Sequence, residues 1–289
     1  DSLEKRFMGT GDIIADLEWD VKSYLMLGGA MHDAAVTAWG IKGWYDSPRP
    51  ISAIRAMADR GQCSEPGSPS YHPAGLPLMP GYIELIAAGD SLEGATGENI
   101  GKIKVKSWRG HGVIDNVDTD VAGVDWILAG NWLPYQRPSF VSPPFAGYLS
   151  GHSTFSRAAA EVLTLLTGDE YFPGGMGVFT APQNEFLVFE DGPSVDVTLQ
   201  WATYRDAADE SGLSRIWGGI HPPADDIPGR KIGIDIGIDA FYKAVSYFGI
   251  PTWVEICDNE IDDDCNGLID EGCITCDANN ITSNMEVVE

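Results

Sequence analysis

The stretch SGHSTFSRAAAEVLTLLTG, at positions 150–168, constrains the fold most strongly because it predicts a long amphipathic helix. Its apolar residues recur at the three- and four-residue spacing of one helix face, which is the face that a helix buries. Gly168 is typical of a residue that ends a helix, and Ser150, Gly151 and His152 fall at the N-terminus. The apolar positions are Phe155, Ala158, Ala159, Val162, Leu163 and Leu166.

Helical patterns also precede and follow this stretch, so the body of the chain is predicted to be mainly α. The first pattern spans 12–42, and the Pro-Arg-Pro triplet at 48–50 interrupts it because proline has no amide hydrogen to donate. A second helix begins at the later proline, which places Arg49 at its N-terminus. Further helices are predicted over 198–211 and 222–248. The apolar positions of the first helix are Met26, Ala30, Ala34, Val36 and Trp39.

The segment of about 63–148 is the least regular part, and we interpret it as a structured insertion. Proline- and glycine-rich loops surround a short helix predicted near 82–88 and a strand predicted over 102–108. A hairpin is predicted within 171–197. Apolar and aromatic residues continue throughout the insertion, which argues against disorder. We therefore expect one helical domain over 1–250 and a separate tail over 251–289.

Composition limits the classes of partner and compartment. The 289 residues contain no run of 18 apolar residues, so no membrane span is expected. The net charge of −25 argues against nucleic acid as a partner. The chain begins at Asp1 without a basic-then-apolar leader, so we expect a processed chain or a fragment. Four cysteines crowd the tail, which favours an oxidising compartment, and we expect a secreted, periplasmic or cell-surface protein.

Residues suited to a tetrahedral oxyanion occur in three short motifs. An oxyanion requires fixed cations, backbone N–H donors and the positive end of a helix. Two histidines that open different helices could lie on opposite sides of one central atom, as a ligand or nucleophile and as a general acid–base. Asp225 follows His221 by one helical turn and could fix the tautomer of its ring. The candidates are Lys42, Arg49, Ser150, Gly151, His152, Arg215 and His221.

Together these motifs resemble a known three-part signature. Lys42-x6-Arg49-Pro50, Ser150-Gly151-His152 and Ser214-Arg215-x5-His221 are similar in spacing and order to the motifs of vanadium-dependent haloperoxidases and type 2 phosphatidic acid phosphatases. The resemblance covers about 30–250. It implies a helical bundle of that kind, vanadate as the cofactor, and hydrogen peroxide and halide as the reactants.

The resemblance also implies a role for each site residue. His221 would bond vanadium, and His152 would act as the acid–base. Lys42 would polarise the bound peroxide and, with the other cations and donors, hold the vanadate oxygens. The residues that would hold these oxygens are Lys42, Arg49, Ser150, Arg215 and the Gly151 amide.

Two aromatic residues favour halide oxidation. Trp39 precedes Lys42 by one helical turn and Phe145 precedes His152 by seven residues, and both positions resemble the apolar halide side of chloro- and iodoperoxidases. Packing in the core is the alternative for both rings. We expect iodide or bromide as the substrate, because chloride is the hardest of the three halides to oxidise and no residue indicates the extra activation that it needs.

Several features depart from the family pattern. Leu149 replaces a proline before the SGH motif, and Pro48 stands where haloperoxidases often have tryptophan. The insertion is longer than is typical. About 40 residues precede Lys42, where the family usually has a further helical half. The sequence does not decide how stable the chain is without that half or whether it forms a homodimer.

Two other functions are consistent with parts of the sequence. The first is a soluble acid phosphatase that uses His221 as its nucleophile, and the motifs alone do not separate it from a haloperoxidase. The second is a degenerate scaffold that serves as a binding module displayed through its tail. A binding module has no need of both His152 and His221, so we favour an enzyme.

The acidic tail resembles short Asp-rich, cysteine-flanked repeats at the C-termini of exported bacterial proteins. Its carboxylates follow the spacing of a calcium loop, with Gly267 at the turn, but Cys273 stands where an EF-hand has glutamate. We expect either a calcium site or an unliganded acidic spacer. Its cysteines, at 257, 265, 273 and 276, allow three disulfide pairings. The candidate calcium ligands are Asp262, Asp264, Asn266, Asp270 and Glu271.

Overall fold

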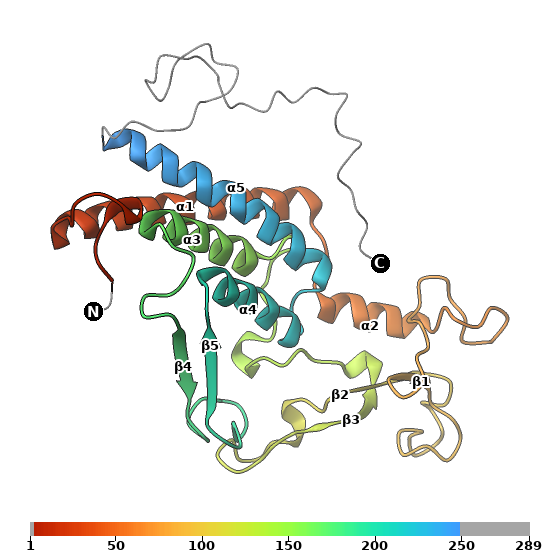
Figure 1. The fold of residues 1–289 in the computed structure, drawn as a ribbon. Coiled ribbons are helices and arrows are strands. Elements are labelled where there is room, and N and C mark those ends of the chain that lie inside the picture. Colours follow the sequence, from red (N-terminus) through yellow and green to blue (C-terminus); the bar gives the residue numbers. More distant parts are fainter. Residues whose placement is uncertain (1–2, 249–289) are drawn as a thin grey trace.

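The computed structural model describes residues 3–248, and it is mainly helical, as the sequence predicts (Figure 1). The predictions for the acidic tail, including its calcium ligands, lie outside the described residues. No helix within 3–248 is both long and apolar enough to cross a bilayer. The helices are α1 (Asp16–Tyr45), α2 (Pro50–Arg60), α3 (Gly151–Thr167), α4 (Tyr204–Trp217) and α5 (Pro223–Tyr247).

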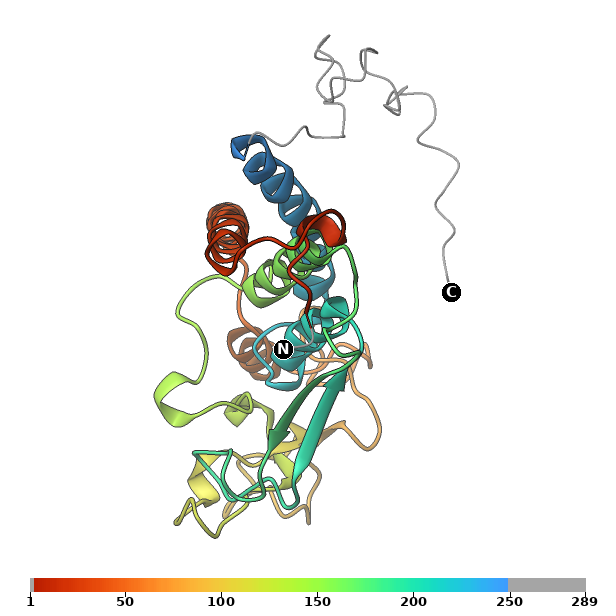
Figure 2. The same ribbon diagram turned by 60° about the vertical axis from the view of Figure 1, so that its left-hand side comes forward.

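Helices α1, α3 and α5 lie side by side and bury the main core between them (Figures 1 and 2). The buried positions of α1 recur every four residues, so one narrow face of this long helix contacts the core. Val36 is 61% exposed and lies on the outer face, so the sequence analysis was wrong to place it on the apolar stripe. The central core residues are Met26, Ala30, Ala34, Ala158, Val162, Leu166 and Phe241.

Glycines on α5 bring its backbone against α3. Gly229, Gly233 and Gly237 recur every four residues and face α3 along its length. A Cβ atom added to any of them would collide with a backbone carbonyl oxygen of α3, so only glycine allows this approach. The distances from that Cβ to the oxygen are 2.9 Å for Gly229 and Ser150, 2.6 Å for Gly233 and Thr154, and 2.6 Å for Gly237 and Ala158.

A network of ion pairs joins α4 to the other two helices. Buried Glu161 on α3 accepts two hydrogen bonds from Arg205 on α4, at 2.9 and 2.5 Å. Buried Asp226 on α5 pairs with Arg230 at 2.6 Å and accepts a hydrogen bond of 2.6 Å from the Ser153 hydroxyl of α3. Each of these buried carboxylates has an arginine partner and a further donor, which is the condition under which burial of its charge is tolerated.

Strands form two small antiparallel sheets outside the bundle. The three-stranded sheet has the order β1-β2-β3, and β4 pairs with β5 as a hairpin. The larger sheet buries a small apolar core of its own, formed by Leu76, Ile103, Val105 and Ala129, on the side of α2 (Figure 1). The strands are β1 (Ile83–Leu85), β2 (Ile103–Trp108), β3 (Val124–Leu128), β4 (Gly177–Ala181) and β5 (Val197–Trp201).

Two local predictions were wrong. The predicted short helix at 82–88 contains strand β1, because Ile83 and its neighbours pair with β2. The predicted helix at 198–211 starts too early, because residues up to Trp201 belong to β5 and α4 begins only at Tyr204. Thr203 fixes that start through a capping box with Asp206.

Replacement of Gly233 by alanine tests the contact between α3 and α5. The added methyl group would press on a backbone oxygen that cannot move away, so we expect a loss of about 1–3 kcal/mol in the free energy of unfolding. Gly28→Ala is the matched control, because Gly28 lies inside α1 with no heavy atom near its added Cβ. We expect this control to stabilise the protein by up to about 1 kcal/mol. Denaturant unfolding of both variants decides, and equal stability would contradict the contact.

Candidate functional site

The three sequence motifs meet where the ends of several helices converge (Figure 1). The arrangement follows from the caps and breaks that the sequence places there, since each motif lies at a helix end. Lys42 lies in the last turn of α1, Arg49 caps the N-terminus of α2, Ser150 caps α3, Arg215 lies in the last turn of α4, and His221 directly precedes α5.

His221 is buried between a carboxylate and a guanidinium. Its Nδ1 lies 2.7 Å from Oδ2 of Asp225, and its Nε2 lies 2.9 Å from Nη1 of Arg49. Arg49 can only donate, so this geometry assigns a proton to Nδ1 and a lone pair to Nε2. Burial lowers the pKa of His221, the hydrogen bond to Asp225 opposes that shift, and the charge of Arg49 adds to it. The ring is therefore a neutral imidazole whose Nε2 can act as a ligand or nucleophile.

Backbone carbonyls of one loop hold two of the cations. Nζ of Lys42 donates to the carbonyl oxygens of Gly147 at 2.7 Å and Ala146 at 3.0 Å. Nε of Arg49 donates to the carbonyl oxygen of Phe145 at 2.8 Å. Burial and the charge of Arg49 together lower the pKa of Lys42 to about 8, against the opposing effect of Asp225. Both cations are thus fixed in position without a carboxylate in direct contact.

Arg215 adds a third cation whose hydrogen-bonding capacity is only partly used. Its Nε is buried and has no hydrogen-bond partner within residues 3–248. No carboxylate of these residues forms an ion pair with Arg215, Lys42 or Arg49, and Asp225 is engaged with His221. Three cations around one carboxylate leave an excess of positive charge in a chain whose overall charge is −25. This donor set fits a multiply charged oxyanion.

The N-terminus of α3 faces the same cluster of cations. The amide of Ser150 donates to the carbonyl oxygen of Asp225 at 2.9 Å, which ties the start of α3 to the first turn of α5. The first amides of an α-helix have no partner within the helix and carry its positive dipole end. Gly151 lies close to an aromatic ring, because a Cβ added to it would be 3.3 Å from Cζ3 of Trp39. Glycine at this position therefore lets the Trp39 ring pack directly against the start of α3.

His152 is the more accessible of the two histidines. The residue is exposed, whereas His221 is buried. Burial by the surrounding protein, together with the charges of Arg215 and Arg49, lowers the pKa of His152 to about 4. A bound anion would offset these charges and raise that pKa. At neutral pH the ring is uncharged and able to accept a proton from a reactant.

An aromatic wall stands beside the cations. The ring centroids of Trp39 and Phe145 are 5.2 Å apart, and Nζ of Lys42 lies 5.6 Å from that of Phe145. Trp39 is 46% exposed and Phe145 is 41% exposed, so neither ring is a plain core residue. Phe155 extends the wall, with its ring 6.2 Å from Trp39. Phe155 lies one turn after His152 and also packs against the main core, as its place on the apolar stripe predicted, but apolar spacing gave no sign of its contact with the wall.

The two residues that depart from the family motif, Leu149 and Pro48, have well-defined surroundings in the structure. Leu149 is fully buried, so its side chain packs inside the protein next to the start of α3. Ser47 holds the preceding loop, because its Oγ accepts from the Tyr148 amide at 2.7 Å and its carbonyl accepts from Gly147 at 3.0 Å. Pro48 is exposed. The loop before α3 is thus anchored by hydrogen bonds to the segment between α1 and α2.

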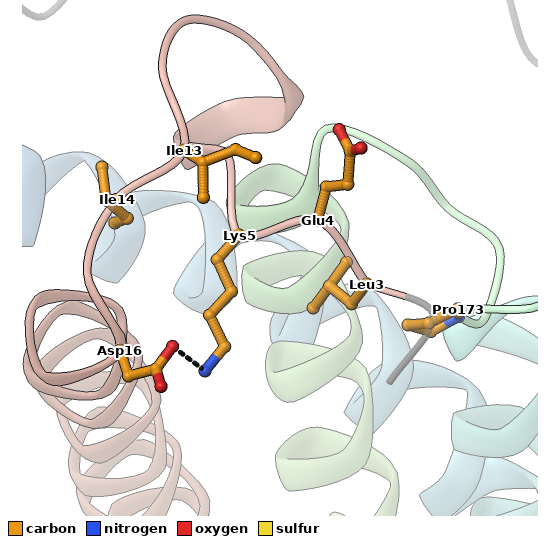
Figure 3. A pocket seen from close by; sticks show the side chains of 7 residues that line it. All are labelled: Leu3, Glu4, Lys5, Ile13, Ile14, Asp16 and Pro173. Carbon is orange, nitrogen blue, oxygen red and sulfur yellow. Dashed lines mark hydrogen bonds and ion pairs between the residues drawn. The ribbon is translucent and has the colours of Figure 1, made fainter.

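A cavity of about 770 Å³ lies elsewhere, beside the first residues and the start of α1 (Figure 3). Leu3 and Ile14 are among its walls, and Lys5 pairs with Asp16 at 3.0 Å across it. It contains none of the residues predicted for the site. The converging helix ends, not this cavity, bring the predicted residues together.

Comparisons with known proteins identify the family and the fold. A family model described as the VCPO second helical-bundle domain matches residues 22–249. The fold is similar to holo and apo structures of a bacterial vanadium-dependent chloroperoxidase, each with a TM-score of 0.53 and 19% identity over 79% of this chain. This chain spans 36% of that protein. A bacterial vanadium-dependent iodoperoxidase is 31% identical over 39% of this chain and 23% of its own, with a TM-score of 0.28. No curated protein matches.

Binding of inorganic sulfate should depend on the proton of Lys42. Sulfate keeps its charge between pH 6 and 10, so any change in its affinity reports on the protein. Above a pH of about 8 we expect the affinity to decline by up to about tenfold per pH unit, because Lys42 loses its proton there. Isothermal titration calorimetry up to about pH 9.5 measures this. Lys42→Met should bind more weakly with no decline near pH 8, and the same decline in that variant would contradict the assignment.

Proposed function

The chain belongs to the family of VCPO second helical-bundle domains, and from this premise we propose that it forms the catalytic part of a vanadate-dependent haloperoxidase. The reaction would be the oxidation of iodide or bromide by hydrogen peroxide to hypohalous acid. The observation that carries the proposal is the cluster of Lys42, Arg49 and Arg215 around His221, whose Nε2 presents a lone pair. The family and the geometry support it together.

The residues present fit vanadate. Arg215 has an unused buried donor, the start of α3 offers backbone amides, and the cations outnumber the carboxylates. We assign His221 Nε2 to the metal. Arg49 now donates to that same nitrogen, so it must turn its Nη1 toward an oxygen of the ligand when His221 binds the metal. The groups that would hold the oxygens are Lys42, Arg49, Ser150, the Gly151 amide and Arg215.

The side chains would divide the work of the reaction. When bound, vanadate supplies a Lewis-acidic centre that activates peroxide toward halide. His152 accepts the proton that peroxide gives up, since its ring is neutral and exposed. Lys42 donates hydrogen bonds to the oxygen that becomes negatively charged. Trp39 and Phe145 exclude water on one side and favour iodide and bromide, which lose their hydration more readily than chloride.

An acid phosphatase on the same scaffold is the second candidate. Asp225 orients His221 so that Nε2 faces the cations, and this geometry equally suits a histidine nucleophile. The half-exposed aromatic wall favours the haloperoxidase, because an apolar side suits a weakly hydrated halide, whereas transfer of a phosphoryl group does not require it. Export, a homodimer and calcium in the tail are further proposals that rest on the sequence alone.

Activity with and without orthovanadate separates the two candidates. The purified chain, apo and reconstituted, is assayed for peroxide-dependent oxidation of iodide and bromide and for hydrolysis of a chromogenic phosphate ester. We expect halide oxidation only with vanadate, and inhibition by excess phosphate. Ester hydrolysis by the apo form, with vanadate acting only as an inhibitor, would instead establish the phosphatase.

Alanine variants of the two histidines should fail in different ways. His221→Ala should lose stoichiometric vanadate, because it removes the nitrogen assigned to the metal. His152→Ala should keep vanadate but lose about 100-fold or more in turnover, the usual contribution of a general acid–base. His32→Ala is the control, since that histidine is exposed on α1 and pairs with Asp33. Vanadium analysis and steady-state kinetics decide. Retained vanadium in the first variant, or unchanged turnover in the second, would contradict the assigned role.

A further inference from the structure

A second cavity, of about 550 Å³, lies between β2, β3 and the C-terminal end of α4. None of the residues assigned to vanadate lines it. Its size is in the range of sites for small organic molecules. Trp108, Trp132, Tyr135 and Trp217 are four of its lining residues, so aromatic side chains form a large part of the wall.

Glu190 is the most deeply buried charged group of this cavity. The residue is only 4% exposed. Its Oε2 accepts from Nε1 of Trp108 at 3.1 Å and from the Ala122 amide at 3.0 Å, and its Oε1 accepts from the Tyr135 hydroxyl at 2.5 Å. All three donors are neutral, and no ion pair to Glu190 occurs within residues 3–248. A buried carboxylate without a cation is costly unless something else supplies the positive charge.

The aromatic residues around Glu190 suit a positive charge. The faces of tryptophan and tyrosine rings attract cations, and this attraction grows when water is excluded. Burial raises the pKa of Tyr135, and the hydrogen bond to Glu190 and the charge of that carboxylate raise it further. The phenol therefore stays protonated and keeps donating to Glu190, which holds the carboxylate in the cavity wall.

We propose that this cavity binds a small organic cation of the quaternary ammonium class. The charge of the ligand would lie beside Glu190 and against the rings of Trp108 and Trp217. The net charge of −25 favours the approach of a cation over that of an anion. Lys106 also lines the cavity, but it is exposed and forms no ion pair with Glu190, so water screens its repulsion.

The cavity also lies against the segment that connects two residues of the vanadate site. Gly219 lines the cavity and stands between Arg215 and His221 in the chain. Trp132 and Pro134 pack on Gly219, because a Cβ added there would lie 3.1 Å from an atom of each. The cation site nevertheless stands on its own contacts and does not depend on vanadate or on halide oxidation.

Choline and its neutral isostere 3,3-dimethylbutan-1-ol test the proposal, since the two differ mainly in charge. Calorimetry on the whole chain at low salt should show choline binding at least about tenfold more tightly. Glu190→Gln should reduce choline affinity at least about tenfold and change that of the alcohol little. Trp217→Leu should weaken choline about threefold to tenfold, and Lys106→Met should tighten it. Circular dichroism shows whether each variant is folded.

Equal affinity for choline and the alcohol in the wild-type chain would overturn the proposal, as would no binding of choline. An unchanged affinity in folded Glu190→Gln would do the same. If Glu190→Gln does not fold, the isostere comparison and the two surface variants, Trp217→Leu and Lys106→Met, decide. The measurement uses apo protein, so its failure is distinct from a failure of the haloperoxidase assay.

Discussion

The close approach of α3 and α5 is the contact on which the rest of the molecule depends. Three glycines on α5 let its backbone touch the carbonyl oxygens of α3, and the first of these oxygens belongs to Ser150. The amide of the same serine is bonded to Asp225, the residue that orients His221. Packing between two helices therefore sets the relative position of two motifs that lie about seventy residues apart in the chain.

The electrostatics of the site follow from an excess of buried positive charge over negative charge, which the fold tolerates. Lys42 and Arg49 are buried without a carboxylate in contact, and carbonyl oxygens compensate only part of their desolvation. Elsewhere the bundle pairs its buried charges carefully, as at Glu161 and Asp226. The contrast between the paired network and the unpaired cluster marks the cluster as functional, because the buried carboxylates that join the helices of the bundle, Glu161 and Asp226, are neutralised by arginines.

The sequence predicted the long helices and which charged residues lie close together, but not the backbone groups that hold these residues. Apolar spacing identified α3 because its core face is continuous. The motifs predicted that His221 and Arg49 lie in one site. The carbonyl oxygens of the loop at 145–147 carry no side-chain signature, so the partners of Lys42 could not be predicted. Strand β1 was missed because its three residues are stabilised only by pairing with β2. The start of α4 was predicted too early because apolar spacing continues before it, whereas the cap at Thr203 determines where the helix begins.

Through the loop at 145–147, the long insertion contacts the candidate site directly, although the sequence places most of the insertion apart from the three motifs. The loop is the last part of that segment before α3, and its carbonyl oxygens contact both Lys42 and Arg49. Because Ser47 anchors this loop through the Gly147 and Tyr148 amides, the insertion ends at a fixed point, and a substitution that loosened this anchor would change the environment of both cations while every charged residue stayed in place.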